Sequence, residues 1–269
     1  MVDIHSHLLP DYDDGPPTLD DTRQMLELAE ASGTRAIVAT PHILDEGDYQ
    51  RKDEILDKFA LVQEAARQDG RKLKIYLGGE IFLFPGVKLD QVFSTLNNNG
   101  KYALVEFGMR QIPEFVPQLL FDWIMEGYFP ILAHPERYLP VIKNLGYAYK
   151  FAQMGVALQL NAGSLLGVFG DSVKRTAGEL IRHNLAHMIA SDGHNVSSRS
   201  VSLLQVREYV SREFGPQTAQ ILLEENPRRA LLGEPLIKEE PVPVENFSQK
   251  PSRWQLIKRR LKWGRKNVG

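Results

Sequence analysis

Two histidines separated by one residue stand at the start of the chain, in Met1-Val-Asp-Ile-His-Ser-His7. Residues 2–5 are apolar enough to form a buried strand, in which side chains two positions apart point to the same side. We therefore expect His5 and His7 to project together from its end. Two adjacent imidazoles are half of a metal site for zinc, iron, manganese or nickel. Taken alone, the pair could also be two surface histidines near a flexible terminus.

Nitrogen and oxygen donors recur where short apolar runs end, and five of the seven histidines are among them. The candidate metal ligands are His5, His7, Asp14, His42, Glu80, Glu106, His134, Asp192 and His194. Asp11 and Asp13 are rivals to Asp14, because Asp-Gly turns are common without a metal. We interpret His183 and His187, which do not follow such runs, as structural. Glu106 alone could also be a capping or salt-bridged carboxylate.

The apolar runs are rich in Val, Ile and Leu and alternate with longer amphipathic stretches. We predict strands at residues 2–5, 35–39, 74–77, 102–107, 129–133, 156–160 and 187–190. We predict helices at residues 19–32, 52–68, 87–97, 114–126, 141–154, 172–184 and 200–214, and closing helices within 219–232. Thr18 is a suitable N-cap for the first helix and Gly33 a suitable C-cap. This alternation predicts a parallel sheet with helical crossovers.

The fold class we predict is α/β, a (β/α)7-like barrel that ends near Leu236. Seven strand–helix units, without a Gly-x-Gly-x-x-Gly turn after the first strand, favour a barrel over a dinucleotide-binding open sheet. Barrel enzymes carry their chemistry at the carboxyl ends of the strands. Because the candidate ligands lie at those ends, we expect them to converge in one pocket.

The composition limits the classes of chemistry that the chain can perform. Its 269 residues include no cysteine, which excludes disulfides, thiolate-bound metals and cysteine-nucleophile phosphatases. The absence of cysteine fits a cytoplasmic protein. No apolar run reaches the roughly 18 residues needed to span a bilayer. The amino terminus lacks the basic and apolar regions of a signal peptide.

The charge is unevenly distributed, because eight basic and no acidic residues follow position 249, against 24 basic and 34 acidic residues before it. Residues 237–251 are proline-rich and predicted to be a linker. Residues 252–269 are predicted to be a basic amphipathic tail, whose helix would place Trp254, Ile257 and Leu261 on one face. Residues 252–266 could contact an anionic membrane surface. Alternatively, the tail is solvated or packs on the barrel or a second subunit. The acidic remainder of the chain argues against nucleic acid as a partner.

Several motifs together resemble those of the polymerase-and-histidinol-phosphatase (PHP) superfamily. They are Ile4-His-Ser-His7, Thr40-Pro-His42, Gly79-Glu80, Glu106, Ala133-His134 and Ser191-Asp-Gly-His194. Five further motifs resemble its bacterial tyrosine-phosphatase branch, which regulates capsule and exopolysaccharide synthesis. They are Asp3-Ile-His-Ser-His7, Asp13-Asp-Gly-Pro16, Ala133-His-Pro-Glu-Arg-Tyr138, Ile189-Ala-Ser-Asp192 and Glu225-Asn-Pro-Arg228. The resemblance implies a distorted TIM-like (β/α)7 barrel of the PHP type over residues 1–236.

The resemblance also implies three divalent metal ions, with manganese favoured and iron or zinc possible. The first ion would be held by His5, His7, Glu80 and Asp192. The second would be held by Glu80, Glu106 and His134, and the third by Asp14, His42 and His194. Arg137 and Arg199 match two arginines that flank the metals in this branch and would act catalytically on the phosphoryl group.

The implied activity is hydrolysis of phosphotyrosine by a metal-activated hydroxide. Bound divalent ions neutralise phosphoryl oxygens and lower the pKa of water from about 15.7 towards 7. A tyrosyl leaving group has a pKa near 10 and needs little protonation, so the general acid stays open. The resemblance implies a membrane-associated bacterial tyrosine kinase as substrate. The composition predicts a cytoplasmic enzyme, which the basic tail could hold at the inner face of the membrane. The alternatives are a small-molecule phosphatase, such as histidinol-phosphate phosphatase, and a non-catalytic metal-stabilised adaptor for membrane or kinase. The sequence leaves the oligomeric state open.

Overall fold

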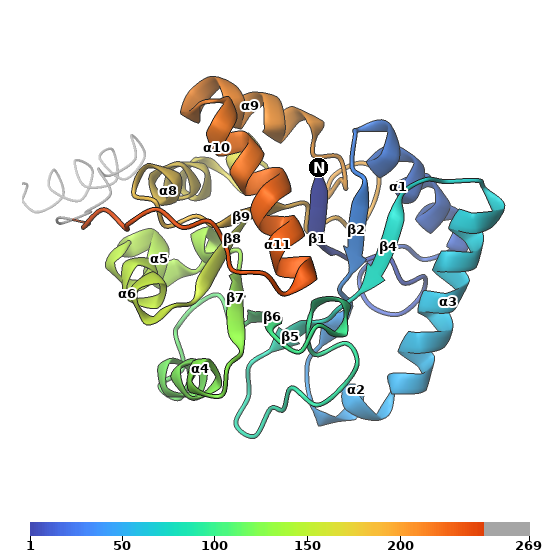
Figure 1. The fold of residues 1–269 in the computed structure, drawn as a ribbon, viewed down its shortest axis with the longest axis horizontal. Coiled ribbons are helices and arrows are strands. Elements are labelled where there is room, and N and C mark those ends of the chain that lie inside the picture. Colours follow the sequence, from blue (N-terminus) through green and yellow to red (C-terminus); the bar gives the residue numbers. More distant parts are fainter. Residues whose placement is uncertain (245–269) are drawn as a thin grey trace, which may run out of the picture.

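A computed structural model describes residues 1–244 of the chain, and these residues form a mixed α/β fold (Figure 1). Its strands are β1 (Val2–Ser6), β2 (Ala36–Ala39), β3 (His42–Ile43), β4 (Lys74–Leu77), β5 (Glu80–Phe82), β6 (Tyr102–Glu106), β7 (Phe129–Ala133), β8 (Ala157–Asn161) and β9 (Met188–Ala190). All seven predicted strands are present, as β1, β2, β4, β6, β7, β8 and β9. The sequence analysis missed β3 and β5, which are only two and three residues long.

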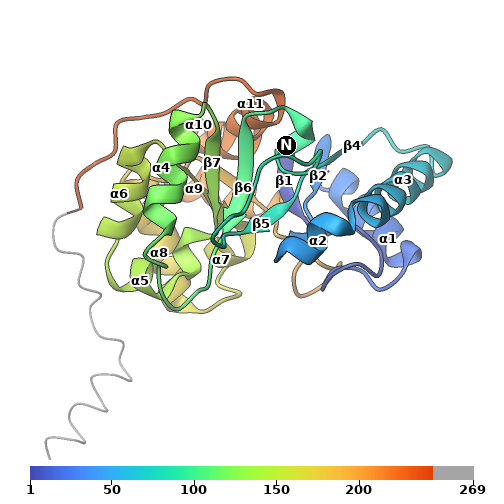
Figure 2. The ribbon, with the colours of Figure 1, turned by 90° about the horizontal axis from the view of Figure 1, so that it is seen from below.

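Helices surround the strands on the outside (Figures 1 and 2). They are α1 (Leu19–Ala31), α2 (Glu46–Gln50), α3 (Lys52–Gln68), α4 (Val116–Met125), α5 (Leu139–Lys143), α6 (Gly146–Met154), α7 (Ala162–Leu166), α8 (Asp171–Arg182), α9 (Leu204–Phe214), α10 (Pro216–Gln220) and α11 (Asn226–Leu232). Thr18 caps α1 as predicted, because its side chain accepts a hydrogen bond from the Asp21 amide. The closing helices α10 and α11 are joined by the π-helical turn η3 (Ile221–Glu225).

The predicted helix at residues 87–97 is wrong. The segment is an irregular loop that ends in the 3₁₀ turn η1 (Leu96–Asn98). Its apolar side chains have helical spacing, but Ser94 Oγ accepts a hydrogen bond from the Gln91 amide at 3.1 Å. Such local contacts between a side chain and the backbone compete with helix formation. Asn97, with a φ of 53°, also lies outside the helical region.

The single helix predicted at residues 141–154 is divided into α5 and α6. The division occurs at Asn144, which has an extended backbone (φ −152°, ψ 103°). Its side-chain Oδ1 accepts a hydrogen bond from the Gly146 amide at 2.8 Å, at the start of α6. Asparagine therefore ends one helix and begins the next, which is a common use of its short polar side chain.

All strand pairs are parallel and form two sheets, with the orders β1-β2-β4 and β3-β5-β6-β7-β8-β9. Only two residues separate β2 from β3 and β4 from β5, so each pair is one interrupted strand. Backbone hydrogen bonds continue across these interruptions, from Gly78 N to Ala39 O at 2.9 Å and from Glu80 N to Pro41 O at 3.0 Å. On its other side, β1 is bonded to the residues after β9, through Asp192 N to His5 O at 2.9 Å.

Two apolar clusters hold these layers together. The larger cluster lies between the strands and the surrounding helices and includes Met25, Ile55, Leu120 and Leu180. The smaller cluster joins side chains of the strands, such as Ile4, to Leu231 of α11. In Figure 1, α11 crosses beside β1. Within residues 1–244, no helix is long and apolar enough to cross a membrane.

Candidate metal centre

The nine candidate ligands meet at the carboxyl ends of the strands. His5 is in β1, His7 follows it, and Asp14 lies in the loop before α1; His42 and Glu80 begin β3 and β5, Glu106 ends β6, His134 follows β7, and Asp192 and His194 follow β9. Seven of the nine residues are buried, the exceptions being His42, which is half-buried, and Asp14, which is exposed. Residues separated by almost 190 positions are thus brought into one acidic and imidazole-rich cluster.

Among the described residues, three groups of ligand atoms lie within 4.8 Å of one another. They are His5, His7, Glu80 and Asp192; His7, Asp14, His42 and His194; and His42, Glu80 and Glu106. The first group is the set that the resemblance implied for the first ion. The second contains the set implied for the third ion and adds His7. The third pairs Glu80 and Glu106 with His42 instead of His134.

Glu80 lies at the middle of the cluster. Its Oε2 is 3.2 Å from His5 Nε2, 3.4 Å from His7 Nε2 and 3.1 Å from His42 Nδ1. Its other oxygen, Oε1, is 2.9 Å from His134 Nε2. Because its two oxygens face different imidazoles, this carboxylate has the geometry to bridge two cations. His134 Nε2 also lies 3.6 Å from Glu106 Oε2, so His134 belongs to the same cluster.

The imidazole tautomers are compatible with metal binding. His5 Nδ1 is 2.9 Å from Gln159 Oε1, and His7 Nδ1 is 2.8 Å from Asp13 Oδ2. His194 Nδ1 is 2.9 Å from the carbonyl oxygen of Asp192. Each acceptor takes the Nδ1 proton and leaves the lone pair of Nε2 free, as in many metal sites. The three Nε2 atoms are buried without a hydrogen-bond partner, a costly arrangement that a bound cation would relieve.

The charges of the cluster favour cations. Burial is the largest influence and would raise the pKa of the Glu80 and Asp192 carboxyls, but the neighbouring histidines, His5 foremost, together outweigh burial and hold the pKa of both well below the usual range. Both groups are therefore ionised. Nitrogen and carboxylate oxygen are the only donors, a set suited to manganese, iron or zinc.

The backbone is locally irregular where it presents three of these side chains. The pairing of β1 with β2 shifts register between Asp3 and Ser6, around His5, and such a bulge re-aims side chains. His134 and Asp192 have positive φ angles of 38° and 50°. Left-handed conformations cost non-glycine residues about 1–3 kcal/mol and cluster at functional sites.

Arg137 and Arg199 approach Asp192 from two sides. Arg137 Nη1 donates to Asp192 Oδ2 at 3.1 Å, and Arg199 Nη2 donates to Oδ1 at 2.9 Å. Arg199 Nη1 also donates to Asp14 Oδ2 at 3.0 Å. Both guanidinium groups are partly exposed, at 23% and 28% of the side chain, so they stand at the mouth of the cluster.

The sequence analysis missed the residues that position the candidate ligands. Asp13, named only as a rival ligand, accepts hydrogen bonds from His7 Nδ1 and from the His42 amide at 3.1 Å. Gln159 binds His5, and Asn161 donates to Asp192 Oδ2 at 2.5 Å. Gln159 and Asn161 lie within the buried strand β8, and buried polar side chains require hydrogen-bond partners. Their presence in an apolar strand could have identified them as residues that contact the cluster. Asp11, the other rival, is exposed and belongs to none of the three groups.

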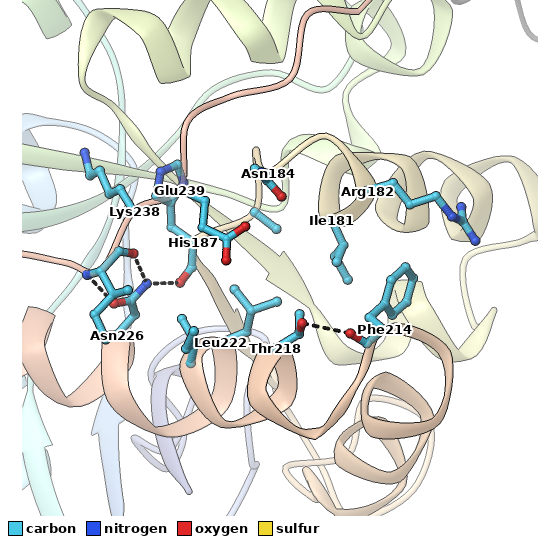
Figure 3. Close-up of a pocket in the computed structure, with 13 residues that line it drawn as sticks. Ile181, Arg182, Asn184, His187, Phe214, Thr218, Leu222, Asn226, Lys238 and Glu239 are labelled. Carbon is cyan, nitrogen blue, oxygen red and sulfur yellow. Dashed lines mark hydrogen bonds between the residues drawn. The ribbon is translucent and has the colours of Figure 1, made fainter.

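His183 and His187 lie away from the cluster, as predicted. His187 lines a pocket near the amino end of β9, between α8, η3 and the chain after α11 (Figure 3). Its Nδ1 accepts a hydrogen bond from the Leu158 amide at 3.1 Å, and its carbonyl accepts one from Asn226 Nδ2 at 2.9 Å. Asn226 also donates to Ile237 O at 2.8 Å, which ties the chain after α11 to β9. These contacts give His187 a structural role.

The chain is similar to proteins of known activity. The family described as "Capsular polysaccharide synthesis, CpsB/CapC" matches residues 1–232. Tyrosine-protein phosphatase YwqE of Bacillus subtilis is 34% identical over 256 residues, which are 91% of this chain and 97% of that protein. Putative tyrosine-protein phosphatase CapC of Staphylococcus aureus is 31% identical over 260 residues, which are 93% of this chain and 98% of that protein.

A solved structure agrees with these sequence matches. It belongs to the crystal structures of YwqE from Bacillus subtilis and CpsB from Streptococcus pneumoniae, described as metal-dependent tyrosine phosphatases. The two chains superpose with a TM-score of 0.85 at 32% identity, over 91% of this chain and 100% of that one. The family match covers all nine residues that form the cluster, from His5 to His194. The chain therefore belongs to the CpsB/CapC family of capsular polysaccharide synthesis proteins.

Proposed function

We propose that this chain is a metal-dependent protein-tyrosine phosphatase. The single observation that carries the proposal is the convergence of five histidines and four carboxylates, with two arginines at the mouth of the cluster. The absence of cysteine in the chain excludes the phosphocysteine route to the same reaction. The relatives named as tyrosine-protein phosphatases support the same activity.

Three divalent ions, with manganese favoured over iron or zinc, are the proposed cofactors. His5, His7, Glu80 and Asp192 would hold the first ion, Glu80, Glu106 and His134 the second, and Asp14, His42 and His194 the third. The bridging geometry of Glu80 and the three free Nε2 atoms support this assignment. When bound, such ions neutralise phosphoryl charge and supply an activated water.

Arg137 and Arg199 are the proposed catalytic residues. Guanidinium groups donate paired, planar hydrogen bonds to phosphoryl oxygens, whose negative charge spreads in the transition state. Arg137 donates to one carboxylate oxygen of Asp192 and Arg199 donates to the other. A phosphoryl group beside Asp192 would therefore be held between the two guanidinium groups. Gln159, which accepts a hydrogen bond from His5 Nδ1, and Asn161, which donates one to Asp192, would keep His5 and Asp192 oriented during the reaction.

We propose that the two sheets together form a distorted (β/α)7 barrel over residues 1–236. The interrupted strands, and the bonds between β1 and the residues after β9, support closure. Residues 237–251 would be the linker and 252–269 the basic tail. Within the described part of the linker, the Val242 amide donates to His183 O at 3.0 Å. The tail, with its predicted helix and membrane contact, lies outside the described residues.

The proposed substrate is a phosphotyrosine protein, a membrane-associated bacterial tyrosine kinase of capsule synthesis. An enzyme in the cytoplasm, held near the membrane by its basic tail, would meet such a kinase more often. Liposome flotation of the full chain and of a chain ending at residue 249 tests the tail. Equal recovery of both in the soluble fraction would dismiss membrane contact.

Phosphate release from a phosphotyrosine peptide tests the activity. The metal-stripped protein should be inactive and should recover with added manganese. Replacing His134 with alanine should lower turnover by several orders of magnitude, because it removes a proposed ligand. The matched control is His183→Ala, since His183 lies outside the cluster and contacts Glu179 of α8. Near-normal turnover by the His134 variant would refute the metal-centre assignment. Faster turnover of histidinol phosphate than of the peptide would favour the small-molecule alternative, and no metal-stimulated turnover of either would favour a non-catalytic adaptor.

A further inference from the structure

A groove of about 360 Å³ opens beside the metal centre. It lies between α7 with the turn that follows it, and the loop after β9. Asp192 and Arg199, which belong to the centre, form part of its wall. The other residues of its lining are uncharged, and Val168 and Val196 are 57% and 43% exposed. An uncharged groove that continues directly from the phosphoryl-binding groups is placed to receive the rest of the substrate.

Phe169 is the aromatic residue in the lining of this groove. Its ring lies over the guanidinium of Arg137, with 4.4 Å between the ring centroid and Cζ. A Cβ atom added at Gly163 of α7 would come within 3.2 Å of Phe169 Cε2. The ring is therefore packed between the backbone of α7 and Arg137, and it stays half-buried at the wall of the groove.

The phenyl ring of phosphotyrosine is one ester oxygen away from phosphorus. When the phosphoryl group is held by Arg137 and Arg199, the phenyl ring must therefore lie against a part of the site next to these two side chains. Aromatic rings pair favourably with one another, at about 0.5–1.5 kcal/mol beyond the area that they bury. Phe169 supplies an aromatic surface at this place, whereas an alkyl phosphate would gain less from it.

We propose that Phe169 is a specificity-determining residue that packs against the phenyl ring of phosphotyrosine in this groove. The same ring packs on Arg137, so the aromatic surface lies directly beside the phosphoryl-binding arginine. This inference rests on the phosphatase activity proposed above.

Steady-state kinetics of Phe169→Leu test the proposal. KM for a phosphotyrosine peptide should rise about 3- to 10-fold, because an aromatic pair is lost. The inhibition constant of inorganic phosphate, which has no ring, should change less than about 2-fold. Phe121→Leu is the matched control, because Phe121 of α4 is 45% exposed and does not line the groove. An equal weakening of peptide and phosphate would mean that Phe169 acts only through Arg137, and no change in either would also overturn the proposal.

Gly163→Ala is an independent variant that displaces the ring without removing it. Alanine is favoured over glycine inside a helix by about 1 kcal/mol, so the fold should not be lost. Because the ring needs to shift by only a few tenths of an ångström, KM for the peptide should rise by less than in Phe169→Leu, again with little change for phosphate. An unchanged KM would argue against a role for the position of the ring. A wild-type protein without metal-dependent turnover of phosphotyrosine would refute the proposed function itself, which is a separate outcome.

Discussion

Replacing Asp13 with asparagine should weaken metal binding although Asp13 is not a proposed ligand. Its Oδ2 accepts from His7 Nδ1 at 2.8 Å and from the His42 amide at 3.1 Å, and its Oδ1 accepts from the Gly15 amide at 3.0 Å. Burial opposes ionisation of Asp13, but the contact with His7 and the two amide hydrogen bonds together outweigh burial and lower the pKa of the carboxyl. Asp13 is therefore an anion that orients the His7 imidazole and at the same time holds the backbone of His42 in place.

Asparagine has one acceptor where aspartate has two. If its oxygen faces His7, its NH2 group points at the Gly15 amide, and two donors meet. If it is turned round, NH2 faces His7 Nδ1 and favours the tautomer with the proton on Nε2, which cannot bind a metal. Loss of such a positioning carboxylate typically costs 10- to 100-fold in metal affinity or activity, or about 1.4–2.7 kcal/mol.

Calorimetric titration of the metal-stripped protein with manganese measures this affinity directly, and peptide turnover at saturating manganese shows whether activity recovers. Asp11→Asn is the matched control, because Asp11 is exposed and its φ of 52° is readily adopted by asparagine. Thermal unfolding of both variants checks that the fold is intact. Equal manganese affinity in the Asp13 and Asp11 variants would refute the positioning role.

Three further outcomes are expected from the structure. Gly193→Ala should lower the free energy of unfolding, measured in urea, by about 1–3 kcal/mol, because the new Cβ would lie 2.4 Å from Val201 Cγ1. Gly108→Ala is the control and should be neutral, because no atom lies within 4 Å of its new Cβ. A similar loss of stability in both variants would contradict this reasoning. Burial lowers the pKa of His187 to about 3, so the unfolded chain binds its proton first as the pH falls below about 6.5. The free energy of unfolding should therefore fall between pH 6.5 and 3, by up to about 1.4 kcal/mol per pH unit, and His187→Gln should have a shallower pH dependence; an unchanged slope would exclude this contribution. Arg137→Lys should lower kcat for the peptide more than 10-fold, because lysine cannot donate the paired hydrogen bonds of guanidinium, and retention of kcat would remove Arg137 from the catalytic role.

The positions of the strands followed from the sequence, because short Val- and Ile-rich runs bounded by helical stretches have few other structures available. The candidate ligands were inferred from the predicted strands, because the carboxyl ends of parallel strands meet at one edge of the sheet. His42, Glu80, His134 and Asp192 could be located in this way without any contact being known. The helix predicted at residues 87–97 failed because apolar side chains that anchor a loop can have the same spacing as those of a helix.

Only the tertiary structure distinguished a candidate ligand from the residue that would position it. Asp13 and Asp14 are adjacent and chemically identical, and the turn between β1 and α1 decides which of them faces His7 Nδ1 and which faces His194. The contact of Gln159 with His5 spans 154 residues, and the packing of Phe169 on Arg137 also joins distant segments. Such pairs have no signature in local sequence, because their proximity is created by the packing of separate strands and helices, whereas residue type and strand position are local properties.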